Sequence, residues 1–179
     1  MLTQAPFAQQ LLHWFDDHGR YHLPWQQSRN GYRVWVSETM LQQTQVATVI
    51  PYFERFIQRF PTVIDLANAE QDEVLHLWTG LGYYARGRNL HKSAQLLVEN
   101  HQGQMPETQE DLEALPGIGR STAGAIRAIA MGQQGVIMDG NVKRVLARFH
   151  GIEGYPGESK INAQMWQHAI DHTPATRTA

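Results

Sequence analysis

An aspartate in the C-terminal third of the chain, Asp139, stands where a carboxylate could do chemistry. It lies in the sequence M-D-G-N-V-K-R-V (residues 138–145), beside a glycine at the start of a predicted helix and downstream of a glycine-rich turn. Breaking a glycosidic bond builds positive charge on the sugar, which a fixed carboxylate stabilises. The alternative is a structural role at the helix start, where Asn141 is the expected cap. Only the preceding turn favours the catalytic interpretation.

A reaction of this kind also requires an acid that protonates the leaving group, and Glu38 is the best candidate. It lies in W-V-S-E-T-M-L-Q-Q-T-Q (residues 35–45), among apolar neighbours. Desolvation raises the pKa of a carboxyl group, which keeps the group protonated near neutral pH. Without further information, the residues favour the alternative, a glutamate on a helix surface.

The turn upstream of Asp139 has the sequence L-P-G-I-G-R-S-T-A-G-A-I (residues 115–126) and lies between two predicted short helices. Gly117 and Gly119 permit positive φ angles and a close approach of the backbone. The second helix would then present free amides and its positive dipole to a DNA phosphate, without reading base sequence. A plain corner between two helices is the alternative. The basic residues nearby are either phosphate contacts or solvated side chains: Arg120, Lys143 and Arg144.

The elements that position these residues are predicted to be helices, because apolar residues recur at helical spacing and no segment alternates well enough for a strand. One helix is expected from Val34 to Ile50, and Pro51 either ends it or opens its successor. Thr62 and Asp65 have the spacing of a helix-capping pair. Further helices are predicted at residues 84–99, 142–149 and 162–172. The predicted fold class is therefore all-α.

The composition fits a globular protein of one large domain or two small lobes, with 179 residues of which 42% are hydrophobic. A net charge of −2 does not by itself indicate DNA binding, although the basic residues between positions 86 and 148 leave room for one basic face. No stretch suits a membrane span or a signal peptide, so we expect a cytoplasmic protein without membrane contact. The chain has no cysteine, and its nine histidines lack a metal-ligand spacing such as H-E-x-x-H. No metal site is predicted.

Four stretches, in order along the chain, resemble the adenine DNA glycosylase family of the helix-hairpin-helix DNA glycosylase superfamily. They are residues 35–45, L-W-T-G-L-G-Y-Y-A-R (77–86), 115–126 and 139–148. The resemblance begins at about Leu11 and ends near Gly151.

The family's fold implies two helical lobes. Residues 29–137 would form a six-helix lobe, with the helix-hairpin-helix at 108–131. Residues 1–28, an N-terminal helix and loop, and residues 138–179 would belong to a second lobe, which in the family holds a [4Fe-4S] cluster.

The resemblance also implies roles for individual residues. Glu38 would protonate a flipped adenine, and Asp139 would stabilise the sugar cation. Asn141 would orient Asp139 or the attacking water. Gln43 and Tyr83 would occupy the space that the flipped base vacates, where an inserted aromatic ring replaces lost stacking. The implied partner is double-stranded DNA with adenine opposite 8-oxoguanine or guanine, bound by a monomer.

Other residues of the same motifs would line the site. Thr44 belongs to the Q-Q-T of the adenine-specific branch. Leu41 and Val46 would line the adenine pocket, unless they only pack in the core. Tyr83 has the same alternative of a core aromatic. The expected DNA contacts in the hairpin and after it are Gly117, Gly119, Arg120, Ser121 and Lys143.

A rival interpretation is an enzyme of the endonuclease III type, which excises oxidised pyrimidines and cuts the strand through a Schiff base. Such enzymes have a lysine directly after the G-R of the hairpin, where this chain has Ser121. Without that amine, strand cleavage is expected to be weak or absent.

A third interpretation is a DNA-binding remnant without activity. The chain ends at Ala179, and the family's next segment supplies the four cysteines of the [4Fe-4S] cluster. We therefore expect a C-terminally truncated protein, with an intact larger lobe, an incomplete second lobe and no ligands for the cluster.

Overall fold

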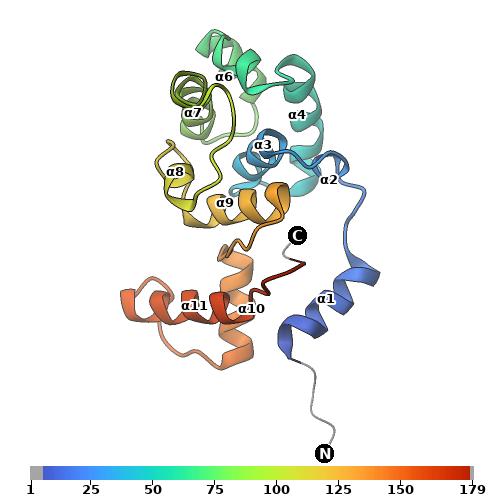
Figure 1. The fold of residues 1–179 in the computed structure, drawn as a ribbon, viewed down its shortest axis with the longest axis vertical. Coiled ribbons are helices and arrows are strands. Elements are labelled where there is room, and N and C mark those ends of the chain that lie inside the picture. Colours follow the sequence, from blue (N-terminus) through green and yellow to red (C-terminus); the bar gives the residue numbers. More distant parts are fainter. Residues whose placement is uncertain (1–5, 178–179) are drawn as a thin grey trace, which may run out of the picture.

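Two helical lobes, one above the other in Figure 1, make up the computed structural model, which describes residues 6–177. The larger lobe contains α2 (Pro24–Gln27), α3 (Gly31–Leu41), α4 (Val46–Arg59), α5 (Val63–Ala67), α6 (Gln71–Trp78), α7 (Ala85–His101), α8 (Gln109–Glu113), α9 (Arg120–Ala125) and a π-helical stretch, η1 (Ile126–Ala130). The smaller lobe contains α1 (Phe7–His18), α10 (Gly140–His150) and α11 (Ser159–His172). Residues 6–177 include no strand, which confirms the all-α prediction. The larger lobe has more helices than the six expected. Three of them, α2, α5 and α8, are short segments of four or five residues.

The larger lobe is organised around α3, which is buried along most of its length. Trp35 and Met40 of this helix are at most 1% exposed, and they share one core with Phe53 of α4 and Trp78 of α6. Full burial of each such side chain stabilises the fold by roughly 1.5 to 3 kcal/mol. The core therefore holds α3, and with it Glu38, in a fixed place.

The smaller lobe has its own core, formed by Met138, Leu146, Met165 and Ala169, with Phe7 of α1 packed against it. The boundary between the lobes was expected at residue 28, but the larger core already includes residues before it. The side chains of two residues before it, Leu23 and Trp25, belong to the larger core. Trp25, which follows Pro24 in the single turn α2, is buried and packs edge-on against Phe53.

The single helix expected from Val34 to Ile50 is wrong. The structure has α3 and α4 there, separated by a turn at residues 42–45 in which Gln43 adopts a left-handed backbone (φ 58°). Pro51 neither ends nor starts a helix but lies inside α4. The turn places Gln43 at the surface, beside the C-terminal end of the helix that carries Glu38.

Two local predictions are confirmed. Thr62 and Asp65 form a capping box at the start of α5, with Thr62 Oγ1 accepting from the Asp65 amide at 3.2 Å. The glycine turn after residue 115 is flanked by the helices α8 and α9.

The segment that leads from the larger lobe to α10 lies directly on α9. A Cβ atom added at Gly124 would lie 2.2 Å from the carbonyl oxygen of Val136, and one added at Gly135 would lie 2.0 Å from the carbonyl oxygen of Gly124. Only glycine allows this approach of two backbones. The contact sets the path of the chain just before Asp139.

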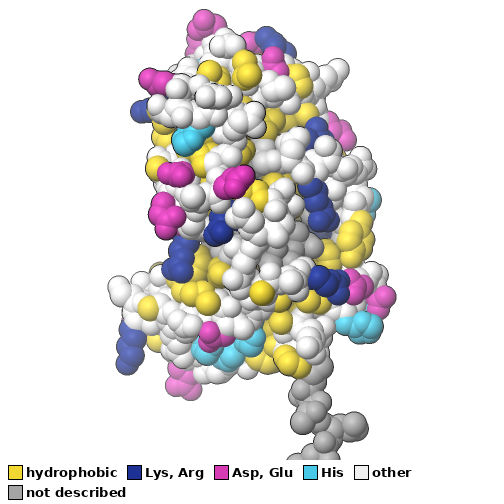
Figure 2. Space-filling model, viewed as in Figure 1, with side chains coloured by type: hydrophobic (Ala, Val, Ile, Leu, Met, Phe, Trp, Pro, Cys, Tyr) yellow, Lys and Arg dark blue, Asp and Glu magenta, His cyan; other side chains and the backbone are white. Residues whose placement is uncertain are grey.

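The surface of the face shown in Figure 2 carries Lys and Arg side chains interspersed with Asp and Glu, rather than one basic surface. Among the described helices, none combines the length and the apolar composition that a bilayer crossing requires.

Candidate active site

A cleft of about 610 Å³ lies between the two lobes, at the C-terminal end of α3 and the N-terminal ends of α9 and α10. It brings together the two acids that the sequence analysis paired, although they are a hundred residues apart in the chain. The residues lining it are Glu38, Leu41, Gln42, Gln43, Thr44, Gln45, Ser121, Thr122, Ile137, Asp139, Gly140, Asn141 and Arg144.

Glu38 is half-buried on the last turns of α3, where it faces this cleft. Burial raises the pKa of its carboxyl group to about 7, and the negative charge of Asp139 contributes to the rise. A carboxylic acid with this pKa is substantially protonated near neutral pH and can act as a general acid.

Asp139 is the N-cap of α10, so the expectation that Asn141 caps this helix is wrong. Asp139 Oδ1 accepts hydrogen bonds from the backbone amides of Asn141 (2.9 Å) and Val142 (2.8 Å). The extended backbone of Asp139 (φ −80°, ψ −177°) lets its short side chain reach both amides. Both bonds use one oxygen, so the carboxylate is held in orientation while Oδ2 is not committed to the cap.

The side chain of Asn141 is held by a different neighbour. Its Oδ1 accepts a hydrogen bond from Arg144 Nη2, while its backbone amide donates to Asp139. Asn141 therefore positions Asp139 through the main chain, and a role of its side chain toward water stays a prediction. Lys143 is half-buried and does not line the cleft.

Ser121 anchors the segment that enters α10. Its Oγ accepts a hydrogen bond from the backbone amide of Met138 at 2.9 Å, one residue before Asp139. Ser121 and Thr122, both at the start of α9, line the same cleft. The hydroxyl at this position therefore connects the hairpin of the larger lobe to the aspartate of the smaller one.

The hairpin glycines differ from each other. Gly117 has a positive φ of 82°, as predicted, whereas Gly119 has φ −96° and a built Cβ there would contact nothing within 4 Å. Gly119 does not use the positive φ that glycine permits, because it is the extended N-cap of α9.

Arg120, an expected phosphate contact, has its guanidinium carbon 3.8 Å from the ring centroid of Trp166 on α11. This cation–π contact joins the two lobes, since Arg120 begins α9 and Trp166 lies in the smaller lobe. A phosphate contact by the same side chain stays a prediction.

Gln43 and Tyr83 are exposed, and both have left-handed backbones, with φ of 58° and 48°. Tyr83 is 61% exposed, so the alternative of a core aromatic is wrong for it. The two residues line an open depression of about 630 Å³ next to the cleft, together with Arg86. Arg86 ends one of the four motifs, but its sequence position predicted no more for it than a place among the basic residues of positions 86 to 148.

Leu41 and Val46, the two aliphatic residues predicted to line the adenine pocket, lie in different places. Leu41 lines the cleft, whereas Val46 does not and packs against the larger core. Thr44 lines the cleft as expected, and its Oγ1 donates to the carbonyl of Gln42 at 3.3 Å.

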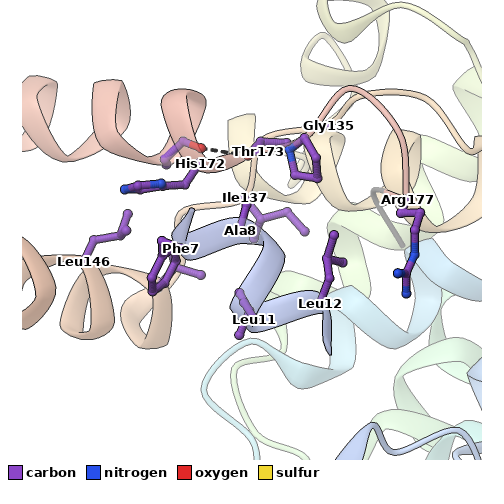
Figure 3. A pocket seen from close by; sticks show the side chains of 13 residues that line it. Phe7, Ala8, Leu11, Leu12, Gly135, Ile137, Leu146, His172, Thr173 and Arg177 are labelled. Atoms are coloured by element: carbon purple, nitrogen blue, oxygen red, sulfur yellow. Dashed lines mark hydrogen bonds between the residues drawn. The ribbon is translucent and has the colours of Figure 1, made fainter. Parts of the chain in front are cut away.

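A second hollow, of about 240 Å³, lies between α1 and the helices α10 and α11 (Figure 3). Phe7 of α1 lies beside Leu146 and His172 there, and Leu11 and Leu12 of the same helix also line the hollow. It contains no carboxylate. Its lining cannot supply the acid pair that the cleft contains.

Residues 36–169 match the family model described as HhH-GPD superfamily base excision DNA repair protein. The chain belongs to this superfamily. The match begins within α3, two residues before Glu38, and includes the hairpin and the whole of α10.

Similar proteins agree with this membership. The chain is 45% identical over 177 residues to the adenine DNA glycosylase of Buchnera aphidicola subsp. Acyrthosiphon pisum. The aligned region covers 99% of this chain and 51% of that protein. It is 49% identical over 169 residues to the human adenine DNA glycosylase, covering 89% of this chain and 31% of that protein. The chain thus spans about half the length of the bacterial relative.

Among solved structures, the fold is similar to that of a thermostable thymine-DNA glycosylase, with a TM-score of 0.85 and 22% identity. The similarity covers 96% of this chain and 79% of that one. At this identity the likeness concerns the fold alone.

The residues of this chain do not fit a [4Fe-4S] cluster, because the chain has no cysteine to supply thiolate ligands. Within residues 6–177, no group of three His, Asp or Glu side chains is arranged to hold a metal ion.

Proposed function

We propose that this chain is a base-excision DNA glycosylase that hydrolyses the N-glycosidic bond of adenine mispaired with 8-oxoguanine or guanine. The observation that carries the proposal is the meeting of Glu38 and Asp139 in one cleft, with the pKa of Glu38 raised to about 7. Membership of the superfamily and the names of the relatives support the substrate class.

The chemistry follows from the states of the two acids. Glu38 transfers its proton to the departing adenine as the C–N bond breaks, and the bonding electrons leave with the base. The sugar becomes cationic, and the carboxylate of Asp139, oriented by two backbone amides, stabilises it. Water then adds to the sugar carbon and loses a proton, and Glu38 regains one. The products are free adenine and an abasic strand that is still intact.

The surrounding residues would bind double-stranded DNA. Gln43 and Tyr83 would enter the duplex where adenine leaves it, and Leu41 and Thr44 would contact the flipped base in the cleft. The turn after α8 would follow the DNA backbone.

The position of Ser121 argues against the rival strand-cutting chemistry. A Schiff base requires an amine, and this position has a hydroxyl that accepts the Met138 amide. We therefore expect hydrolysis without β-elimination.

The test is a single-turnover assay on duplexes with adenine opposite 8-oxoguanine, adenine opposite guanine, or adenine opposite thymine as the control. Free adenine and a strand that breaks only after alkali are the expected products for the first two duplexes. Excision of oxidised pyrimidines with spontaneous strand cleavage would favour the endonuclease III interpretation. Tight binding to an uncleavable adenine analogue without any excision would identify a DNA-binding protein that lacks the activity.

A further inference from the structure

Arg86, on the first turn of α7, makes an unusual set of contacts for a half-buried arginine. Its Nη1 donates to three backbone carbonyls at the end of α3 and in the turn after it: Thr39 (3.0 Å), Met40 (2.9 Å) and Gln42 (2.5 Å). The last carbonyls of a helix have no partner within the helix and carry its negative dipole, so a cation there is stabilising. Arg86 therefore fixes the end of the helix that bears Glu38.

The other terminal nitrogen reaches a second segment as well. Nη2 donates to the carbonyls of Leu81 and Gly82 and to Thr44 Oγ1, each at 3.3 Å. The guanidinium also lies 5.4 Å from the ring centroid of Tyr83 and 5.6 Å from that of Trp78. One planar group thus binds residues 39–44 and residues 81–83, two segments that are about forty positions apart in the chain.

Each segment presents one strained, exposed residue. Left-handed backbone costs a non-glycine residue roughly 1 to 2 kcal/mol, and such strain persists where surrounding contacts over-determine it. Gln43 and Tyr83 both have this conformation, and both follow a carbonyl that Arg86 binds, that of Gln42 and that of Gly82. Nη1 and Nη2 of Arg86 both donate to protein acceptors and its Nε is buried, so little of this guanidinium is left for a phosphate.

We propose that Arg86 is a positioning residue that holds Gln43 and Tyr83 as one rigid unit for insertion into an opened duplex. The role in the duplex rests on the proposed function; the coupling of the two segments does not. In this arrangement the loss of Arg86 releases both segments together, while the larger core still holds the buried face of α3 and the two backbone amides still hold Asp139.

The experiment compares Arg86→Met with Arg88→Met, a matched control that removes the same charge from the same depression but none of these carbonyl contacts. Backbone hydrogen exchange of the DNA-free protein is measured first. Arg86→Met is expected to speed exchange about tenfold or more in both residues 41–45 and residues 79–84, and Arg88→Met in neither. Faster exchange in only one segment would overturn the coupling.

The second measurement is the ratio of single-turnover rates for adenine opposite 8-oxoguanine and opposite guanine. Stacking of a base on an aromatic side chain is worth about 1 to 3 kcal/mol. We therefore expect Arg86→Met to lower this ratio by about fivefold or more, and Tyr83→Ala added to it to lower the ratio no further. Arg88→Met should weaken binding to all duplexes alike. Independent, multiplying effects of the Arg86 and Tyr83 changes would refute the single unit.

The test also covers a variant that fails to fold and an unmodified chain without activity. If Arg86→Met does not fold, Arg86→Lys replaces it: one ammonium cannot reach both segments, so exchange should rise in residues 79–84, whose bonds to Arg86 are the longer ones. Unchanged exchange in that variant would overturn the proposal. If the unmodified chain excises no adenine, the proposed function fails, and the exchange data alone decide the coupling.

Discussion

Replacing Glu38 by glutamine should make the folded protein more stable and inactive at the same time. The magnitude follows from the pKa. Folding moves the pKa of this carboxyl group from 4.5 to about 7, which corresponds to about 3 kcal/mol at about 1.4 kcal/mol per pH unit. Water in the open cleft screens part of this cost, so the expected effect is about 1 to 3 kcal/mol.

The sign depends on which state binds more protons. Because the folded pKa is the higher one, the folded protein binds more protons than the unfolded chain between pH 4.5 and about 7. The free energy of unfolding therefore falls as pH rises through this window and stays low above it. The neutral amide of Glu38→Gln has no ionisation cost, so the stability gained by the variant should be small at pH 5 and reach its full value at pH 8.5.

The assay is urea unfolding of both proteins at pH 5 and pH 8.5, with Glu99→Gln, a change at an exposed glutamate of α7, as the control. Single-turnover excision and affinity for an uncleavable adenine analogue are measured on the same preparations. Excision should disappear in Glu38→Gln while the affinity is retained, and excision by the unmodified chain should decline above pH 7. An equal stability difference between Glu38→Gln and the unmodified chain at both pH values would show that Glu38 is not desolvated, and the general-acid assignment would lose its physical basis.

Three other changes test the site and its supports. Asp139→Asn should lower the excision rate by about a hundredfold or more. Its melting temperature should change little, because the amide oxygen can still accept hydrogen bonds from the two backbone amides at the start of α10. A large loss of stability would indicate a structural role instead. Gly124→Ala should destabilise the protein by about 1 to 3 kcal/mol in urea unfolding, since its Cβ would meet the Val136 carbonyl, whereas Gly119→Ala has open space and should cost far less. Burial, and then the neighbouring imidazoles of the smaller lobe, lower the pKa of His150, so the stability of that lobe should be lost as pH falls below about 6.5. His150→Gln should flatten the melting temperature against pH in that range, and parallel curves for the two proteins would contradict this.

Much of the architecture was accessible from the sequence because it depends on local spacing. Apolar residues at helical intervals predicted α7, α10 and α11, although they did not show the break between α3 and α4. Thr62 and Asp65, three positions apart, predicted the capping box that the structure contains. The glycine at position 117 predicted a turn with positive φ. In each case the interacting atoms belong to residues within a few positions of each other, so their pattern in the sequence is also their pattern in space.

The acid pair was identified differently. Glu38 and Asp139 are a hundred positions apart, and the resemblance of four ordered motifs paired them where composition could not. Their placement in one cleft comes from the tertiary structure: α3 is held in the larger core, while the backbone contact at Gly124 directs the following segment toward it.

What the sequence by itself determined was therefore the all-helical fold class, the capping box of Thr62 and Asp65, the turn at Gly117, and the residue types available for acid catalysis. The tertiary structure alone decided that the helix after Val34 breaks at residue 42, that Arg120 stacks on Trp166, and that Arg86 joins two distant segments. The physical reason is common to all three. A helix breaks, or an arginine chooses its partners, according to acceptors and rings supplied by segments far away in the chain, and no local spacing records where those segments will lie.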